Sequence, residues 1–578
     1  MPDVIEVRNL SYTYPGDHKP VLREVNFSVK RGEVLGIMGP IGAGKTTLSL
    51  CLSGLIPHSI GGNLQGEVIV TGLKTVEHEV SVLNQKIGIV FQDPEIQIFG
   101  MEVEEDVGFK PKNMEMPDNE VSNRVRWALH YVRLDGFEKR FPYTLSGGQK
   151  QRLAIASILS GRPEILILDE PTSELDPIGK VQVFDVIRQL TKSESMTVVI
   201  VEHEAEELAR IADRILVMKN GQVVRDASPR ECFKDVEELE DLGVRVPEVL
   251  ELGHLLVKDQ PQKWTTYDYP LTVEEAQSRL EPLLRNLPEK SQSFSETASE
   301  YDKAEVVIEV QNLTHIYGAG SPEEVVALQG INLQVHRGEM VALIGQNGCG
   351  KTTLAKHLNG LLRPTEGTVR VLGLDTRRVS AGKLAEKVGY CFQNPDHQIF
   401  KSTVFEEVAF GARNLLLSKE EIQARVQESL GTVGLIGYEK SNPFFLSKGD
   451  RQRVAVASVL AMHPEVLVID EPTTGMDWRT SDNMMLLVKD LNAKGHTVLF
   501  ITHNMRIVAQ YARRVVVMHD GRVLLDGPTR SVFAQPDLLG KAYINPPQIT
   551  RLCHGLRNYI ASDRLTVREA YEELRRFH

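Results

Sequence analysis

The chain has 578 residues, of which 42% are hydrophobic and 25% are charged, and its formal net charge is −12 at pH 7. This composition is typical of a globular protein, and the length suggests about three to five domains. The negative charge argues against a general electrostatic attraction to nucleic acid, so we expect no nucleic-acid partner. Five dispersed cysteines with no C-x-x-C pair argue against a zinc or iron–sulfur site and favour a reducing compartment.

No part of the sequence approaches the ~20 uninterrupted apolar residues that cross a bilayer. The N-terminal segment MPDVIEVRNL lacks the basic start and the apolar run of a secretory signal. We therefore expect a cytosolic protein.

Short strand-like segments recur along each half of the chain. The first segment of each half, at 4–14 and at 307–317, alternates apolar and polar residues as a half-buried strand does. The later segments are apolar almost throughout and are typical of buried strands. They are EVLGIMG (33–39), ILILDE (165–170), VVIVEH (198–203), MVALIG (340–345), VLVIDE (466–471) and VLFITH (498–503). Their alternation with helical patterns predicts an α/β fold with a mostly parallel sheet covered by helices.

The second half of the chain repeats the sequence motifs of the first half in the same order. GPIGAGKTT (39–47) recurs as GQNGCGKTT (345–353), and LSGGQKQRLAIAS (145–157) recurs as LSKGDRQRVAVAS (446–458). The repeat continues beyond these motifs, because VPEVLELGHLL at 246 resembles PPQITRLCHGL at 546. We therefore predict two equivalent domains, each followed by a small C-terminal subdomain, with a Ser/Glu-rich flexible linker between the halves. The predicted boundaries are 1–240 and 241–285 for the first copy, 286–304 for the linker, and 305–535 and 536–578 for the second copy.

The glycine-rich loops carry the spacing G-x-x-x-x-G-K-[ST], in which glycines let backbone N–H groups turn toward phosphate oxygens at a helix N-terminus. The lysine of such a loop neutralises the β- and γ-phosphates, and the following threonine ligates Mg²⁺. Both loops follow a predicted buried strand, which makes a chance match a poor explanation. The predicted ATP-binding residues of the loops are Gly39, Gly42, Gly44, Lys45, Thr46 and Thr47, and Gly345, Gly348, Gly350, Lys351, Thr352 and Thr353.

Paired acidic residues end two of the apolar strands. Asp169 and Asp470 would be costly to bury without a partner, and a magnesium ion supplies that partner. Glu170 and Glu471 follow directly and are predicted to polarise the attacking water as general bases. The alternative is that these carboxylates only cap strand ends in solvent, which two phosphate loops disfavour.

These motifs, in this order and spacing, resemble the nucleotide-binding domains of ABC (ATP-binding cassette) proteins over nearly the whole chain. The resemblance implies that Gln92 and Gln393 sense Mg²⁺ and the γ-phosphate, and that His203 and His503 contact the γ-phosphate. It also aligns Tyr14 and Tyr317 with the aromatic residue that stacks on adenine, although a tyrosine near a strand end is more often a packing residue. The signature residues implied to bind ATP are Ser146, Gly147, Gly148 and Gln149 in the first copy, and Ser447 and Gly449 in the second.

In the family each ATP lies between the Walker motifs of one copy, which are the phosphate loop and the strand that ends in Asp169 or Asp470, and the signature of the other copy, which is LSGGQ (145–149) or LSKGD (446–450). The two fused cassettes are therefore expected to pair with each other, with one chain per complex. The first site would use the signature LSKGD, in which Lys448 replaces a glycine and Asp450 replaces a glutamine. This departure puts ATP hydrolysis at the first site in doubt. We expect the second site, formed by the Walker motifs of copy two and LSGGQ, to carry most of the turnover.

Three features resemble ATPases of the energy-coupling-factor (ECF) type, which power importers of vitamins, vitamin precursors or metal ions. No membrane span is fused to the cassettes, the C-terminal subdomain is duplicated, and Q-[IL]-F follows each Q-loop, ending in Phe99 and in Phe400. The resemblance implies separate scaffold and substrate-binding membrane subunits, with this chain at the cytoplasmic face of the membrane. The alternative for the Q-loop segments is inward packing of Ile98, Phe99, Ile399 and Phe400. The competing functions are the tandem ATPase of a sugar-type importer and a cytosolic ABC translation factor; a DNA-repair ATPase would need zinc cysteines or a long coiled coil.

Overall fold

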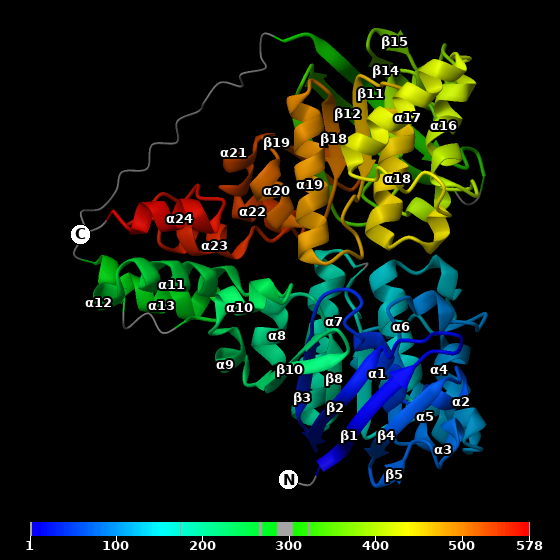
Figure 1. The fold of residues 1–578 in the computed structure, drawn as a ribbon, viewed down its shortest axis with the longest axis vertical. Coiled ribbons are helices and arrows are strands. Elements are labelled where there is room, and N and C mark those ends of the chain that lie inside the picture. The colour runs from blue at the N-terminus through cyan, green and yellow to red at the C-terminus, as the bar shows by residue number, and fades with distance from the viewer. Residues whose placement is uncertain (1–2, 174, 265–268, 286–303, 322–323, 577–578) are drawn as a thin grey trace. The chain divides into compact units, whose positions relative to one another are not determined.

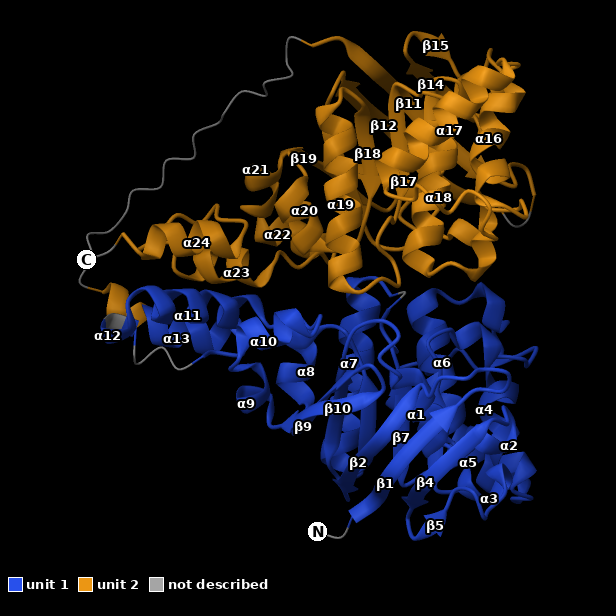
Figure 2. Cartoon of the chain, in the orientation of Figure 1, with its two compact units in different colours: residues 1–280 blue, residues 281–578 orange. Residues whose placement is uncertain are grey.

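The computed structural model describes residues 3–173, 175–264, 269–285, 304–321 and 324–576. The chain forms two compact units, Met1–Leu280 and Glu281–His578 (Figure 2). All but residue 304 of the predicted linker lies outside the described residues. The predicted division of each copy at 240/241 and at 535/536 stays a prediction.

Each unit begins with a small antiparallel sheet (Figure 1). In the first unit the strand order is β2-β1-β4-β5, and β1 pairs with both β2 and β4. The alternating pattern predicted for the first strand is observed, because residues that point inward are buried and their neighbours are exposed. The strands of this sheet are β1 (Asp3–Thr13), β2 (Leu22–Lys30), β4 (Asn63–Val70) and β5 (Leu73–Lys74), and in the second unit β11 (Val306–Tyr317), β12 (Val325–His336), β14 (Glu366–Val371) and β15 (Leu374–Asp375).

A six-stranded sheet forms the centre of each unit, in the order β10-β9-β3-β8-β7-β6 in the first and β16-β17-β18-β13-β19-β20 in the second. Five neighbouring strands of each sheet are parallel, and only the last, β10 or β20, is antiparallel. The predicted mostly parallel sheet is confirmed. The strands are β3 (Val34–Met38), β6 (Ile87–Val90), β7 (Ile165–Asp169), β8 (Thr197–Val201), β9 (Arg214–Lys219) and β10 (Gln222–Ala227), and β13 (Met340–Gly345), β16 (Val388–Cys391), β17 (Val466–Asp470), β18 (Thr497–Ile501), β19 (Arg514–His519) and β20 (Arg522–Pro528).

Buried apolar strands require cover on both faces, and this explains the two hydrophobic clusters found in each unit. Every residue of β3, β7 and β8 is buried. In the first unit one face packs against α1 and the antiparallel sheet, and the other packs against the long helices α6 and α7. The helices that matter for the site are α1 (Lys45–Leu52), α6 (Gly147–Leu159) and α7 (Pro177–Ser193), and their equivalents α14 (Lys351–Leu358), α18 (Lys448–Leu460) and α19 (Trp478–Ala493).

The remaining helices form two peripheral groups in each unit. One group lies between the Q-loop and the signature, where η denotes a 3₁₀ turn: η1 (Pro94–Ile96), α4 (Val103–Asn113), α5 (Asp118–Tyr131) and η2 (Pro142–Thr144), with η3 (Pro395–His397), α16 (Val404–Asn414), α17 (Lys419–Val433) and η4 (Pro443–Phe445) in the second unit. The other group follows the last strand: α9 (Pro229–Phe233), α10 (Val236–Asp241), α11 (Glu248–Asp259), α12 (Pro261–Trp264) and α13 (Val273–Leu284), with α21 (Thr529–Phe533), α22 (Pro536–Lys541), α23 (Gln548–Gly555) and α24 (Val567–Leu574). The short helices α2 (Leu55–His58), α3 (Val80–Leu83), α8 (Ala205–Ile211), α15 (Ala381–Ala385) and α20 (Met505–Tyr511) complete the described fold.

Within the described residues, no helix combines the length and the apolar character that a bilayer span requires.

Candidate functional site

The glycine-rich loop of each unit connects a central strand to the first buried helix. Gly39 has φ +151°, and a Cβ atom there would lie 2.3 Å from the carbonyl oxygen of Met218, so only glycine permits this close approach of two backbones. Lys45 is 5% exposed, and its ammonium donates hydrogen bonds to the carbonyl oxygens of Gly39 (3.0 Å) and Pro40 (3.1 Å). The loop therefore curls around a buried positive charge, which suits an anionic ligand. The equivalent contacts of the second unit run from Lys351 Nζ to the carbonyl oxygens of Gly345 (2.9 Å) and Gln346 (2.7 Å).

The two predicted metal-binding aspartates end β7 and β17 in unequal surroundings. Burial raises the pKa of Asp169 to about 6, although a hydrogen bond from Thr46 acts in the opposite direction. Its Oδ1 atom is buried and has no hydrogen-bond partner among the described residues. Asp470 Oδ2 instead accepts hydrogen bonds from Thr352 (3.0 Å) and Tyr390 (3.0 Å). Burial raises the pKa of Asp470 as well. A buried carboxylate oxygen that lacks a donor fits a cation, so the residues present suit Mg²⁺.

The predicted catalytic glutamates lie against the predicted histidines of the same unit. His203 Nε2 is 2.8 Å from Glu170 Oε1, and His503 Nδ1 is 3.1 Å from Glu471 Oε2. Thr474 also donates to Glu471 Oε2 at 2.8 Å. Burial alone would raise the pKa of Glu471, but the charge and hydrogen bond of His503, together with Thr474, lower it to about 2. Glu471 is therefore held as a carboxylate, which is the form that can accept a proton.

Backbone strain marks the same two glutamates. Glu170 has φ +48° and Glu471 has φ +47°, in the left-handed region that non-glycine residues rarely adopt. Each residue follows directly on the last residue of its strand. Other equivalent positions share this conformation, among them Asn9 with Asn312 and Asn220 with Asp520, so the backbone geometry fixes the direction of the two glutamates and does not by itself identify a functional site.

The predicted Q-loop glutamines differ in their contacts. Gln393 Nε2 reaches Glu471 Oε2 at 3.4 Å, so it lies beside the predicted general base. Gln92 Nε2 donates instead to Ser173 Oγ at 3.2 Å, in the loop that follows Glu170. Both side chains thus lie next to the acidic loop of their own unit.

The predicted adenine-binding tyrosines lie beside the helices that begin at the phosphate loops. The hydroxyl of Tyr14 is 3.1 Å from Thr47 Oγ1, and that of Tyr317 is 3.2 Å from Thr353 Oγ1. Tyr317 is 40% exposed, so part of its ring is open to solvent. These positions bring both tyrosines next to predicted phosphate-binding residues, as a base-stacking role requires.

The signature residues cap the helices α6 and α18. Ser146 Oγ accepts a hydrogen bond from the backbone N–H of Gln149 (3.3 Å), and the Gln149 side chain accepts one from Ser146 N (2.9 Å), which forms a capping box. In the second unit Ser447 Oγ donates to the Asp450 carboxylate at 2.7 Å. The LSKGD sequence therefore engages its serine proton internally and adds a negative charge beside it.

Several residues near the glutamates were not predicted from sequence. Tyr390 binds Asp470, and its counterpart by the repeat is Ile89. Glu202 is buried beside His203, where it accepts a hydrogen bond from His203 N (2.9 Å) and one from Thr172 (2.8 Å), and burial raises its pKa. Comparing the two copies position by position would have found both, because each replaces a residue of different chemistry.

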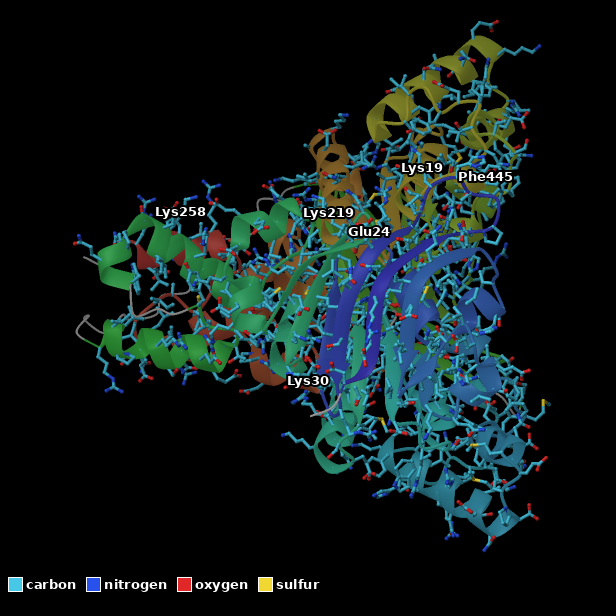
Figure 3. All side chains as sticks on the ribbon, turned by 60° about the horizontal axis from the view of Figure 1, so that its bottom comes forward. Lys19, Glu24, Lys30, Lys219, Lys258 and Phe445 are labelled. Atoms are coloured by element: carbon cyan, nitrogen blue, oxygen red, sulfur yellow. The ribbon has the colours of Figure 1, made fainter. Side chains whose placement is uncertain are left out.

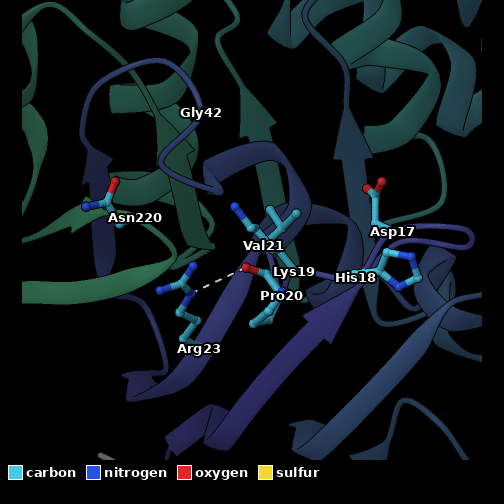
Figure 4. Close-up of a pocket in the computed structure, with 8 residues that line it drawn as sticks. All are labelled: Asp17, His18, Lys19, Pro20, Val21, Arg23, Gly42 and Asn220. Carbon is cyan, nitrogen blue, oxygen red and sulfur yellow. Dashed lines mark hydrogen bonds between the residues drawn. The ribbon is translucent and has the colours of Figure 1, made fainter.

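A cavity of about 670 Å³ borders the first phosphate loop (Figure 4). It adjoins Gly42, and its charged lining residues are the basic Lys19 (labelled in Figure 3) and Arg23 and the acidic Asp17. Arg23 Nε donates to the carbonyl oxygen of Pro20 at 3.4 Å, which orders the loop between β1 and β2. Two basic side chains and one acidic side chain therefore line the space beside Gly42, a feature that the motifs alone did not predict.

Comparison with known proteins gives one family for both halves. The family model described as ABC transporter matches residues 22–173 and 328–474. A protein of Caldanaerobacter subterraneus subsp. tengcongensis, named as an ABC transporter ATP-binding protein, is 44% identical over 559 residues, which cover 96% of this chain and 96% of that protein. A protein of Methanosarcina mazei with the same kind of name is 38% identical over 579 residues, which cover 99% of this chain and 97% of that protein. A solved structure described as cbiO1 from Clostridium perfringens, part of the ABC transporter complex cbiONQ, is 37% identical over 43% of this chain and 98% of its own, with a TM-score of 0.38.

The unpartnered oxygen of Asp169 predicts a stability effect. An acid whose pKa is raised by folding carries no penalty below its ordinary pKa near 4 and the full penalty above pH 6. Asp169→Asn should therefore stabilise the ligand-free protein at pH 8 by on the order of 2–3 kcal/mol, since each pKa unit corresponds to about 1.4 kcal/mol. Thermal unfolding of the wild-type and variant chains at pH 8 and pH 5 measures the difference, which should shrink at pH 5.

Asp470→Asn is the matched control. Its carboxylate already receives hydrogen bonds from Thr352 and Tyr390, so the same change should give a smaller gain. An equal or larger gain for Asp470→Asn would show that the missing donor is not what destabilises Asp169.

Proposed function

This chain belongs to the ABC transporter family, and we propose that it is the ATP-hydrolysing subunit of an ECF-type importer for a vitamin, a vitamin precursor or a metal ion. Scaffold and substrate-binding membrane subunits would be separate chains, and the tandem cassettes would work at the cytoplasmic face of the membrane. ATP is the substrate of the cassettes, and its hydrolysis would be coupled to transport.

A repeated aromatic pair on the surface supports a membrane partner. Phe99 and Phe109 are 58% and 47% exposed, and their ring centroids lie 4.5 Å apart. The second unit repeats the pair with Phe400 (56% exposed) and Phe410 (37% exposed) at 4.8 Å. Exposed apolar clusters of this kind mark surfaces that bind other proteins or membranes. The residue before each Q-loop phenylalanine packs inward, since Ile98 is 6% and Ile399 is 3% exposed.

In each Q-loop segment the isoleucine therefore packs inward and the phenylalanine points outward. The isoleucine anchors the segment in the helical layer, and the phenylalanine is left for a partner. A sugar-type importer ATPase remains the nearest alternative, but the duplicated Q-loop extension and C-terminal helices disfavour it. A translation factor would be expected to carry a charged helical linker, whereas the sequence between the cassettes is acidic and serine-rich.

The chemistry follows from the contacts within each unit. Lys45 and Lys351 place a buried positive charge inside the phosphate loop, where the β- and γ-phosphates are proposed to bind. Glu170 and Glu471 are the proposed general bases for the attacking water, and His203 and His503 orient them and contact the γ-phosphate. Magnesium, when bound, would neutralise charge on the phosphates, held by Thr46, Gln92 and Asp169, or by Thr352, Gln393 and Asp470.

The two signatures differ in ways that favour unequal sites. The Ser447 proton is donated to Asp450, and the Lys448 side chain lies against Gly475 in the loop after Glu471. A phosphate that approached Ser447 would meet the Asp450 carboxylate, and like charges repel. We therefore propose that the ATP bound by the Walker motifs of copy one, which the family pairs with LSKGD, turns over slowly. The ATP bound by copy two, which pairs with LSGGQ, turns over quickly.

Replacing each glutamate in turn tests this assignment. Glu471→Gln should lower the steady-state ATPase rate by about 10²-fold or more, the lower range for loss of a general base, while Glu170→Gln should lower it less. The rates are measured at saturating ATP on the purified full chain. A larger loss for Glu170→Gln would contradict the assignment.

A repair experiment sharpens the same test. Lys448→Gly combined with Asp450→Gln restores the LSGGQ sequence in copy two. In the Glu471→Gln background this double change should raise the residual rate, because the Ser447 proton is released and the nearby negative charge is removed. No increase would show that the altered signature does not limit the first site.

Affinity purification from detergent-solubilised membranes tests the transport role. The tagged chain should recover a polytopic scaffold protein and a small substrate-binding membrane protein. Phe99→Ala combined with Phe400→Ala should abolish this recovery and leave the ATPase rate of the isolated chain within about twofold, because exposed side chains contribute little to stability.

Leu486→Ala, at a 48% exposed apolar residue of α19, serves as the control and should retain the partners. Recovery of ribosomes with the wild-type chain would favour the translation factor. Membrane partners that survive the double phenylalanine change would show that they bind another surface.

A further inference from the structure

Two buried histidines lie behind the proposed adenine-binding tyrosine of the second unit only. His357 on α14 is fully buried, and His315 on β11 is 8% exposed. Their ring centroids are 4.7 Å apart at an interplanar angle of 76°, and His315 meets the ring of Tyr317 edge-on, at 4.6 Å and 84°. The repeat aligns these histidines with Tyr12 and Cys51 of the first unit.

The hydrogen bonds of the pair fix where its protons lie. His357 Nδ1 is 2.7 Å from the carbonyl oxygen of Thr353, which can only accept, so this nitrogen donates. His315 Nδ1 lies 3.2 Å from the carbonyl oxygen of Arg363 and donates for the same reason. The same His315 Nδ1 is 3.2 Å from His357 Nε2, which accepts in the neutral ring. His315 Nε2 has no hydrogen-bond partner among the described residues.

These contacts close into a ring through Thr353. The Thr353 carbonyl oxygen accepts a hydrogen bond from His357, and His357 accepts one from His315. The His315 ring packs against Tyr317. The Tyr317 hydroxyl then returns to Thr353 Oγ1 at 3.2 Å. Each of these contacts restricts the next, so the direction of the Tyr317 ring depends on the two buried histidines His315 and His357.

In the first unit a different residue packs against the equivalent tyrosine, Tyr14. Tyr12 meets Tyr14 edge-on at 4.9 Å and 77°, and its hydroxyl donates to the carbonyl oxygen of Gly61 at 2.9 Å. Gly61 lies in the loop after the phosphate-binding helix, as Arg363 does in the second unit. The loop of the first copy is longer, GLIPHSIGGNLQGEV against GLLRPTEGTV, so the reach needed from the strand differs.

We propose that His315 and His357 are positioning residues that set the Tyr317 ring for the nucleobase and thereby give the second cassette its own affinity for the adenine of ATP. The proposal rests on the nucleotide-binding role proposed above for Tyr317. A base stacked on an aromatic side chain contributes about 1–3 kcal/mol, so displacement of the ring weakens base binding without changing the phosphate loop.

The test compares a ligand that has a base with one that lacks it. The full chain carries Lys45→Ala, to block the first phosphate loop, and Glu471→Gln, to prevent turnover. Binding of ATP and of inorganic tripolyphosphate is then measured by calorimetry. His315→Ala should weaken ATP binding by about tenfold and leave tripolyphosphate binding within about twofold, since tenfold corresponds to partial loss of the stacking interaction.

Two further variants separate positioning from general damage. His315→Tyr with His357→Cys installs the pair of the first unit, whose hydroxyl can donate to the Arg363 carbonyl oxygen, and should restore ATP affinity to within about threefold of the parent chain. His315→Ala in a chain that instead carries Lys351→Ala and Glu170→Gln should leave ATP binding by the first cassette unchanged.

Equal weakening of ATP and tripolyphosphate would overturn the proposal, because it would show that the pair supports the whole helix α14. Unchanged ATP affinity in His315→Ala would overturn it too, and so would a pair exchange that restores nothing. Failure of the parent chain to bind ATP at all would count against the proposed function itself, so the two results are distinguishable.

Discussion

The architecture depends on burying a positively charged lysine at the end of a parallel sheet. Lys45 and Lys351 are almost fully buried, and burial of an unpaired ammonium is costly. Each cassette meets this cost with carbonyl oxygens of its own loop, which bend back because glycine permits the approach. The loop shape and the lysine position therefore depend on each other. The strand before the loop and the helix after it must then be held rigidly, which explains why both sheets and both hydrophobic clusters converge there.

The two cassettes share this centre and differ in the layer of residues around it. Asp470 receives a tyrosine hydroxyl that Asp169 lacks, and Glu202 lies beside the histidine of one copy only. In one signature the Gln149 side chain accepts a hydrogen bond from the Ser146 backbone N–H, and in the other the Asp450 carboxylate accepts one from the Ser447 hydroxyl. None of these changes alters the phosphate loop. They change proton positions and local charge around the loop while the fold is retained.

The sequence predicted the central strands β3, β7 and β8, with their counterparts β13, β17 and β18, because each is almost wholly apolar, and burial of both sheet faces demands that pattern. It also predicted the pairs of Glu170 with His203 and of Glu471 with His503 only as members of one site, since their 2.8 Å and 3.1 Å contacts depend on the register of β7 with β8 and of β17 with β18. Contacts such as Tyr390 with Asp470 join residues of different strands and carry no motif. The direction of Phe99 could not be decided from composition either, because an aromatic residue suits a core and an interface equally.

Fusion of the two cassettes explains how such differences can persist. In a pair of identical chains every substitution appears in both sites, so a change that slows hydrolysis slows it twice. A tandem chain supplies one copy of each kind in fixed proportion and makes the proposed pairing of the copies intramolecular, which raises the effective concentration. In the proposed mechanism one site can then lose turnover and still contribute by binding, because closure of the two copies would require only that ATP favours the closed state over the open state. The Ser447–Asp450 hydrogen bond and the His315–His357 pair are differences that this arrangement tolerates, since each changes the side-chain contacts of the second copy and leaves those of the first as they were.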